Sequence, residues 1–500
     1  MLTVGRDIRT FDIIFIVITI ILSFGIALFV PVEYLPWTLA GLGIVIIMIL
    51  WANFGDITTL ILLWFITVAC FSYFFWKKQL PVPGFGGFNI TVDRLFILGI
   101  FIIALISLVL GTLPYKPPPK VIKMFFLMMG YFTLSLFWSG FRSIADVSPH
   151  FRLTGGYYFP AVVMVLAYWA VNDEPQLKKV AWFFLGFGLY LTITAWAEHL
   201  KLWSIVFPRY IANPELGIHW GRARGPFLVS ASLGITLVFC FFNNLYLARR
   251  LEGPIKGLMY FANMLMLPAI FFTQTRSVWL AMIICGLMWI VLARGIRSRA
   301  GLFFTFVSAA VVIFAIFYAD ILSRQRTKGG VTDPYPVYAR IGLAKITLNV
   351  VKSHPITGVG FGHFRDYAAS YSQDPTSKYI RFGSRLMEHN NFLSILAETG
   401  IIGLTLYLLV LWRIFQHSKR LYYRIPPEAD GWVSRDVGIL FWILLADYII
   451  DAMFRETSVD PFNNGLLFAF TGIILAIDYL LEYRPAKVPD IKRIQQASET

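Results

Sequence analysis

The sequence predicts an all-α polytopic integral membrane protein with about fourteen membrane-spanning helices. Of its 500 residues, 58% are hydrophobic and 14% are charged, whereas a soluble domain has about 45–50% apolar and about 25% charged residues. Aromatic residues make up 17% of the chain, and large rings suit both a lipid-facing surface and the interfacial belts of a membrane protein. A water-soluble core is therefore excluded, and residues 1–500 read as a single membrane domain.

Apolar runs long enough to cross about 30 Å of hydrocarbon recur along the chain. The first run is too long for a signal peptide, has no small-residue cleavage site after it and is followed at once by further runs. The Pro/Gly stretches at 81–87 and 115–120 are typical of turns and linkers between spans. The expected spans are 11–30, 36–53, 57–76, 94–113, 121–139, 157–171, 180–198, 226–247, 255–273, 277–294, 301–319, 390–415, 435–454 and 463–482.

The formal net charge of +15 favours topology determinants and contacts with anionic headgroups over nucleic-acid binding. With the N-terminus inside, the inner segments carry 22 Lys and Arg residues and the short outer segments carry 11. Ten more lie in the long segment 320–390, which the positive-inside rule discounts. We therefore expect both termini in the cytoplasm and 320–390 as a large extracytoplasmic loop. The three cysteines lie inside apolar runs, where packing is expected and disulfides or zinc sites are not.

The long outer loop contains a helical pattern of apolar residues. Val337, Ile341, Ala344, Leu348 and Val351 follow helical spacing, which predicts a short amphipathic helix on the outer mouth of the bundle. The loop is therefore expected to be a folded cap.

The first polar motif is GRARGPF at 221–227, directly before the outer end of the 226–247 span. Arg222 and Arg224 lie on a short turn bracketed by glycines, and the planar donors of arginine fit phosphate oxygens. The alternative is that both side chains anchor the protein to outer-leaflet headgroups.

The second motif is TQTRSVWLA at 273–281, in a minimal connection between two spans. Its Arg276 must stay at the outer surface or point into the bundle, where a charge is costly unless it is paired. Interfacial anchoring is again the alternative, although an arginine in a short outer loop opposes the positive-inside bias.

The third motif is EHNNFLSILAETGIIG at 388–403, which places His389 just before the outer end of the 390–415 span. Asn390 and Asn391 are candidate helix caps. A neutral imidazole at this position fits a general base, whereas a capping or interfacial histidine is the simpler alternative.

All three motifs precede a span that is expected to run from outside to inside. Each therefore lies at a helix N-terminus, which carries about half a positive charge and free N–H groups. A pyrophosphate fits such a ring of donors. The same positive charge is expected to disfavour protonation of His389 and to keep it a proton acceptor near neutral pH.

Two further features are weaker indications. Glycines at 358, 360 and 362 in HPITGVGFGHF allow a phosphate-binding loop, but without a strand before them they favour a tight structural turn. The acids Glu398, Asp447, Asp451 and Asp478 lie in or near spans, form no evident ion relay, and the last two are expected to be solvated at span ends.

Taken in order, these motifs resemble the O-antigen ligase/polymerase family. The resemblance rests on an Arg-x-x-Gly-x-Phe turn, a Thr-Arg-Ser before a span, His-Pro-x-x-Gly-Val-Gly, and His-Asn-x-x-Leu followed by Glu-x-Gly-x-x-Gly. It covers mainly residues 220–405, while the first 200 residues match only as a run of spans.

The resemblance implies a membrane glycosyltransferase of the C-type class that takes an undecaprenyl-pyrophosphate-linked glycan as donor, a hydroxyl of a glycan, lipid or protein as acceptor, and no metal or other cofactor. It implies functional roles for Arg222, Arg276 and His389. Arg340 lies where the family often has an arginine, and Arg224 occupies a position that is usually small, so it shares or replaces the role of Arg222. Polymerase, ligase and protein-glycosylating activities remain open. A transporter or flippase for an amphipathic anion is the alternative outside the family.

Overall fold

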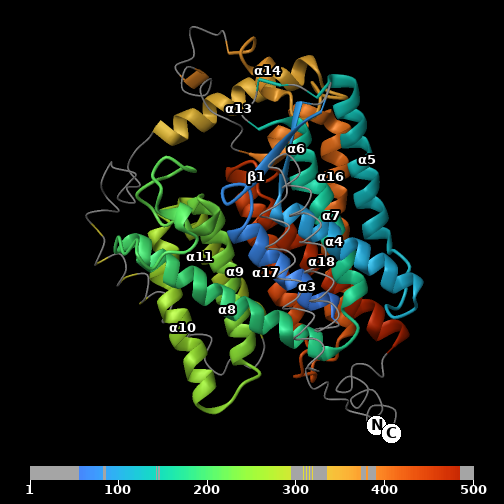
Figure 1. Cartoon of the computed structure of the whole chain (residues 1–500), viewed down its shortest axis with the longest axis vertical. Coiled ribbons are helices and arrows are strands. Elements are labelled where there is room, and N and C mark those ends of the chain that lie inside the picture. The colour runs from blue at the N-terminus through green and yellow to red at the C-terminus, as the bar shows by residue number, and fades with distance from the viewer. Residues whose placement is uncertain are drawn as a thin grey trace, which may run out of the picture.

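The computed structural model is a bundle of long helices capped at one end (Figure 1). It describes residues 56–82, 86–141, 143–144, 147–293, 335–372, 379–380 and 390–484, with isolated residues between 308 and 318. Within this part of the chain, nine helices are long and apolar enough to cross a membrane, and two shorter apolar helices, α3 and α11, accompany them. The chain is therefore a multi-pass membrane protein, as its composition predicts.

Every expected span within the described residues coincides with one of these apolar helices. The expected spans at 11–30, 36–53 and 301–319 lie outside the described residues. The apolar helices are α3 (Ile57–Cys70), α4 (Val92–Val109), α5 (Lys120–Ser139), α7 (Phe159–Ala170, which spans as part of the continuous helix Pro149–Ala170), α8 (Glu174–His199), α9 (Ser230–Ala248), α10 (Gly253–Phe272), α11 (Arg276–Leu292), α16 (Asn391–Arg424), α17 (Arg435–Phe454) and α18 (Pro461–Tyr483).

The all-α expectation has one small exception. The strands β1 (Lys77–Val82) and β2 (Gly86–Thr91) pair antiparallel, with Lys77 opposite Thr91. They include the Pro/Gly stretch 81–87, where only a turn was expected. A Pro/Gly pattern indicates where the chain reverses, but it does not predict that the residues on either side form paired β-strands.

The centre of the bundle is α9, in which every residue is buried. Helices α7 and α18 approach each other closely, because a Cβ atom on Gly472 would lie 2.2 Å from the carbonyl oxygen of Met164. Small residues at such contacts let the backbones of membrane helices meet. All three cysteines are buried and free, which agrees with a packing role.

A short helical segment joins the 140s to α7 without a break. Helix α6 (Pro149–Leu153) leads into a π-helical turn, η1 (Thr154–Tyr158), and then into α7. A Cβ atom on Gly156 would lie 2.6 Å from the carbonyl oxygen of Ser458. Glycine is therefore required where this turn meets the chain between α17 and α18.

The cap consists of α13 (Tyr335–Ser353), α14 (Phe364–Ala368) and the turn between them, and it lies across the top of the bundle in Figure 1. We call this end of the bundle the cap end and the opposite end the far end. His363 fastens the cap, since its Nδ1 lies 2.6 Å from Oδ2 of Asp366 and its Nε2 lies 2.9 Å from the carbonyl oxygen of Gly140, after α5.

Helix α13 occupies the residues where the amphipathic helix was expected, but its buried face differs from the expected one. Val337, Ile341 and Leu348 are exposed. The buried cluster instead contains Leu343, Ile346 and Val350, together with residues of the following turn, of α14 and of α16. Helix α13 carries apolar residues on two faces, so spacing alone did not identify which face packs.

The glycine-rich turn at 358–362 packs against α16 instead of opening into a loop. Val359 and Gly360 donate their N–H groups to the carbonyl oxygens of Ala397 (3.0 Å) and Glu398 (2.8 Å). Gly360 has a φ of 107°, and a Cβ atom there would lie 2.1 Å from Cβ of Ser139. These amides are used internally, which agrees with a structural turn.

Candidate functional site

The turn at 221–227 is tied to the end of α8. The carboxylate of Glu198 accepts hydrogen bonds from the N–H groups of Arg224 (2.8 Å) and Gly225 (2.7 Å). Glu198 is 6% exposed, so these bonds hold the turn from inside the bundle. The single-turn helix η3 (Gly225–Phe227) then leads to α9.

Arg224 is completely buried within the loop that follows α8. Its guanidinium donates to the carbonyl oxygens of Leu216 (2.6 Å), Ile211 (3.1 Å) and Asn213 (3.2 Å) and lies 4.7 Å from the ring centroid of Trp220. Burial lowers the pKa of Arg224, although the charge of Glu198 opposes this effect. The contacts are those of a residue that holds a loop in shape.

Arg222 instead faces the second motif. Its Nη1 donates to the carbonyl oxygen of Gln274 at 3.4 Å, and the adjacent Ala223 N–H donates to the carbonyl oxygen of Phe272 at 3.0 Å. Arg276 is the first residue of α11, two residues after Gln274. The first two motifs are separated in sequence by α9 and α10, but they lie side by side in the structure.

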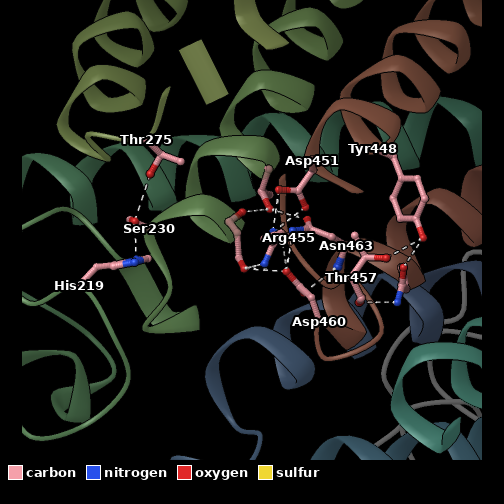
Figure 2. Close-up of polar contacts among 12 residues, drawn as sticks. His219, Ser230, Thr275, Tyr448, Asp451, Arg455, Thr457, Asp460 and Asn463 are labelled. Atoms are coloured by element: carbon pink, nitrogen blue, oxygen red, sulfur yellow. Dashed lines mark hydrogen bonds and ion pairs between the residues drawn. The ribbon is translucent and has the colours of Figure 1, made fainter. Parts of the chain in front are cut away.

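A hydroxyl bridge lies next to this contact. The Ser230 hydroxyl is 3.1 Å from Oγ1 of Thr275 and 3.0 Å from Nδ1 of His219 (Figure 2). Ser230 is buried, and His219 is exposed with a left-handed φ of 64°. Sequence reasoning missed His219, because it lies in an irregular loop where no periodic pattern singles it out.

A dense ionic group surrounds Arg455, just after α17. Its Nε donates to both carboxylate oxygens of Asp451 (2.6 and 2.7 Å), its Nη1 to Ser232 (2.9 Å) and its Nη2 to Asp460 (2.7 Å), as Figure 2 shows. Burial raises the pKa of Asp460, but the Arg455 charge and the hydrogen bonds from Ser232 and Asn463 outweigh it and hold that pKa below its ordinary value. This group joins α9, α17 and α18.

Asp460 also caps α18, since its side chain accepts a hydrogen bond from the Asn463 N–H at 3.1 Å. The sequence carries a signal for this cap, an Asp followed by Pro at the first helical position. The signal does not reveal the partner, Arg455. Asp451 was expected to be solvated and is in fact 1% exposed, and Asp478 is 6% exposed, because arginines from neighbouring segments cover both carboxylates.

A second buried ionic group lies beside the π-helical turn. The guanidinium of Arg152 binds both carboxylate oxygens of Glu398 (2.6 and 3.0 Å) and lies 3.4 Å from Glu456. Its Nε donates to the Ser458 hydroxyl at 3.0 Å. Glu398 of the third motif is therefore a structural acid that joins α6 to α16.

The third motif begins α16. Asn390 caps the helix as predicted, since its Oδ1 accepts a hydrogen bond from the Leu393 N–H at 3.0 Å, and its Nδ2 donates to the carbonyl oxygen of Met453 at 3.1 Å. The guanidinium of Arg340, on α13, lies 5.4 Å from the ring centroid of Phe454. Arg340 and the start of α16 thus meet at the end of α17. His389 lies outside the described residues.

A chain of side-chain contacts links the motifs into one region at the cap end. Thr275 contacts Ser230; Ser232, half a turn along α9, contacts Arg455; and the residues before Arg455 contact Arg340 and Asn390. Three helix N-termini, those of α9, α11 and α16, therefore lie in the same region as Arg222, Arg276 and Arg340. Such an arrangement suits a phosphate-bearing anion.

Metal ligands are not gathered in this region. Within the part of the chain that the structure describes, no group of three or more His, Cys, Asp or Glu side chains is arranged to hold a metal ion.

Comparison with known proteins supports the motif-based interpretation. A search of curated proteins found no match. Residues 261–408 match the family model described as O-antigen ligase, a segment that contains the second half of α10, all of α11, α13 and α14, and the first half of α16. The resemblance seen in the motifs is thereby confirmed, and the chain is similar to the O-antigen ligase/polymerase family over this segment.

Proposed function

We propose that this protein is a membrane glycosyltransferase that transfers or polymerises a glycan carried on undecaprenyl pyrophosphate, at the outer face of the bacterial cytoplasmic membrane. The observation that carries the proposal is the meeting of the 221–227 turn, the 273–276 turn and the start of α16 at the cap end. The O-antigen ligase match supports the reaction class. We also propose that the whole chain has a fold of the C-type glycosyltransferase class, with about fourteen membrane-spanning helices.

In this proposal, the arginines bind the lipid pyrophosphate. Arg222 and Arg276 neutralise the negative charge that grows on the leaving group, which preorganised cations stabilise in a water-poor site. Arg340 is close enough to the start of α16 to assist. Arg224, whose guanidinium is held by three carbonyl oxygens, positions the turn that carries Arg222.

His389 acts on the acceptor. The acceptor hydroxyl oxygen attacks the anomeric carbon, the bond from that carbon to the phosphate oxygen breaks, and the hydroxyl proton passes to the imidazole of His389. The products are a new glycosidic bond and free undecaprenyl pyrophosphate. General-base assistance of this kind contributes about 10²–10⁴-fold in rate.

The experiment is a turnover assay with purified protein in nanodiscs and a defined undecaprenyl-pyrophosphate oligosaccharide. We expect lipid-pyrophosphate release by the wild type and at least about 10²-fold slower release by His389→Ala, with unchanged thermal melting. Arg209→Ala is the control, because Arg209 is exposed and, among the described residues, donates to the carbonyl oxygens of Trp203 and Ser204. Undiminished turnover by His389→Ala would remove the histidine from the mechanism, and no release with any acceptor would favour a transporter.

We also propose that both termini are cytoplasmic and that the cap is extracytoplasmic. The native cysteines are buried, so single cysteines introduced at exposed positions can report the side of the membrane. A membrane-impermeant thiol reagent applied to spheroplasts should label Ser353→Cys, on α13, and should label Lys419→Cys, near the end of α16, only after lysis. The reverse pattern would invert the proposed orientation.

A further inference from the structure

A cavity lies at the far end of the bundle, away from the proposed glycan site. Its volume is about 390 Å³, and it lies between the segment before α5, the last turns of α16 and the end of α18. Pockets that hold small ligands have volumes of about 300–1,000 Å³. The far end is where α16 and α18 finish and α5 begins, so the cavity opens at the level where spans meet headgroups.

The two acids of the cavity are already paired with Arg424, which does not line the cavity. The two acids that line it, Asp478 and Glu482, are both within ion-pair distance of Arg424, at 2.5 and 3.1 Å. Asp478 also lies 2.8 Å from Nε2 of His417.

The remaining lining cations are Lys120, Arg413 and Arg420, and all three are exposed. Arg413 donates to the neutral side chain of Gln416 at 3.3 Å. Among the described residues, neither Lys120 nor Arg420 has an ion-pair partner. Three positive charges therefore face one cavity without carboxylate partners of their own.

Part of the cavity lining is rigid and aromatic. Pro117, Pro118 and Pro119 line it, and proline fixes the backbone φ angle. The Lys116 ammonium pins this segment by donating to the carbonyl oxygens of Tyr168 (2.8 Å) and Val171 (2.5 Å). The rings of Tyr168, Tyr479 and Tyr483 complete this part of the lining, and tyrosine is enriched at the headgroup level of membranes.

We propose that this cavity binds the headgroup of an anionic phospholipid, with its phosphate held by Lys120, Arg413 and Arg420. Basic pockets between helices on the cytoplasmic side of membrane proteins suit such headgroups. The lipid source is favoured over a soluble phosphate because the cavity combines exposed cations with tyrosines at the ends of membrane-spanning helices. The site is separate from the cap end, so it rests on the proposed membrane orientation but not on the proposed glycosyltransferase activity.

The test is native mass spectrometry of the full-length protein in detergent, titrated with cardiolipin, phosphatidylcholine or inorganic phosphate. The triple variant Lys120→Gln, Arg413→Gln and Arg420→Gln should retain cardiolipin at least about ten-fold less than the wild type, a change of about 1.4 kcal/mol. The control carries Lys123→Gln, Lys256→Gln and Lys419→Gln, which removes the same charge from exposed residues at the far end that do not line the cavity. It should bind within about two-fold of the wild type.

Three results would overturn the proposal. These are an equal loss in the two triple variants, equal retention of phosphatidylcholine and cardiolipin by the wild type, or complete displacement of cardiolipin by millimolar inorganic phosphate. If the cavity variant fails to fold, the melting temperature of the wild type tests the proposal. Cardiolipin should raise this temperature, and phosphatidylcholine should not. Equal shifts with both lipids would contradict the proposal.

Discussion

Two turns at the cap end carry arginines, and they differ in what surrounds the charge. In the 455–460 turn, the guanidinium of Arg455 binds the carboxylates of Asp451 and Asp460. In the 221–227 turn, the guanidinium of Arg224 binds three backbone carbonyl oxygens, and Arg222 reaches a fourth, on Gln274. Carboxylates neutralise an arginine, whereas carbonyl groups satisfy its donors and leave its charge in place.

In the 455–460 turn the carboxylates bind the guanidinium itself, whereas in the 221–227 turn the carboxylate of Glu198 binds the backbone N–H groups of Arg224 and Gly225. We propose that the first group is structural and that the second turn holds Arg222 for an anionic substrate. The 455–460 turn is a closed ion network that fixes the starts of α9 and α18 against the end of α17. The 221–227 turn lies against the start of α11, where Arg222 donates to the carbonyl oxygen of Gln274. A count of arginines near span ends does not distinguish the two.

The largest expected effect comes from breaking the closed network. Arg455→Gln would leave the buried carboxylates of Asp451 and Asp460 without their counter-charge, and loss of one partner of a buried ion pair costs about 3–5 kcal/mol. We expect poor yield and a strongly lowered melting temperature in detergent. Arg209→Gln is the control, since it removes an exposed cation. Near wild-type melting of Arg455→Gln would show that the network contributes little.

A smaller effect is expected within the 221–227 turn, where two arginines only two residues apart should behave differently. Arg224→Ala removes hydrogen bonds to three carbonyl oxygens, and we expect a loss of about 2 kcal/mol in stability together with reduced activity. Arg222→Ala, which removes the 3.4 Å hydrogen bond to Gln274, should lower the melting temperature less than Arg224→Ala and reduce activity more. Melting temperature and turnover should be measured on the same preparations of both variants. Equal destabilisation by the two variants would contradict the different roles of Arg222 and Arg224.

Much of the helical framework could be predicted from sequence, because hydrophobic length is a strong signal in a membrane protein. Each expected span within the described residues falls on a helix, and the Asn390 cap follows from its residue type and position. The proximity of the first two motifs followed from topology: α9 and α11 start at the same end because a single span, α10, lies between them.

The contacts that could not be predicted from the sequence are made between residues that are distant in the chain. The face of α13 that packs is decided by the glycine-rich turn and by α16, not by its own spacing. Arg152 finds Glu398 across 246 positions, and His219 reaches Ser230 only because the loop after α8 folds back. Such pairings arise from packing, which periodicity does not encode.

The most direct test of the central claim is donor binding at the cap end. Equilibrium binding of an undecaprenyl-pyrophosphate oligosaccharide should be measured in nanodiscs for the wild type, Arg222→Ala, Arg276→Ala and Arg209→Ala. Charge-assisted hydrogen bonds contribute about 1.5–3 kcal/mol each, so we expect binding at least about ten-fold weaker for Arg222→Ala and Arg276→Ala and unchanged for Arg209→Ala. Wild-type affinity in both site variants, with normal melting, would contradict the assignment of the pyrophosphate to these turns.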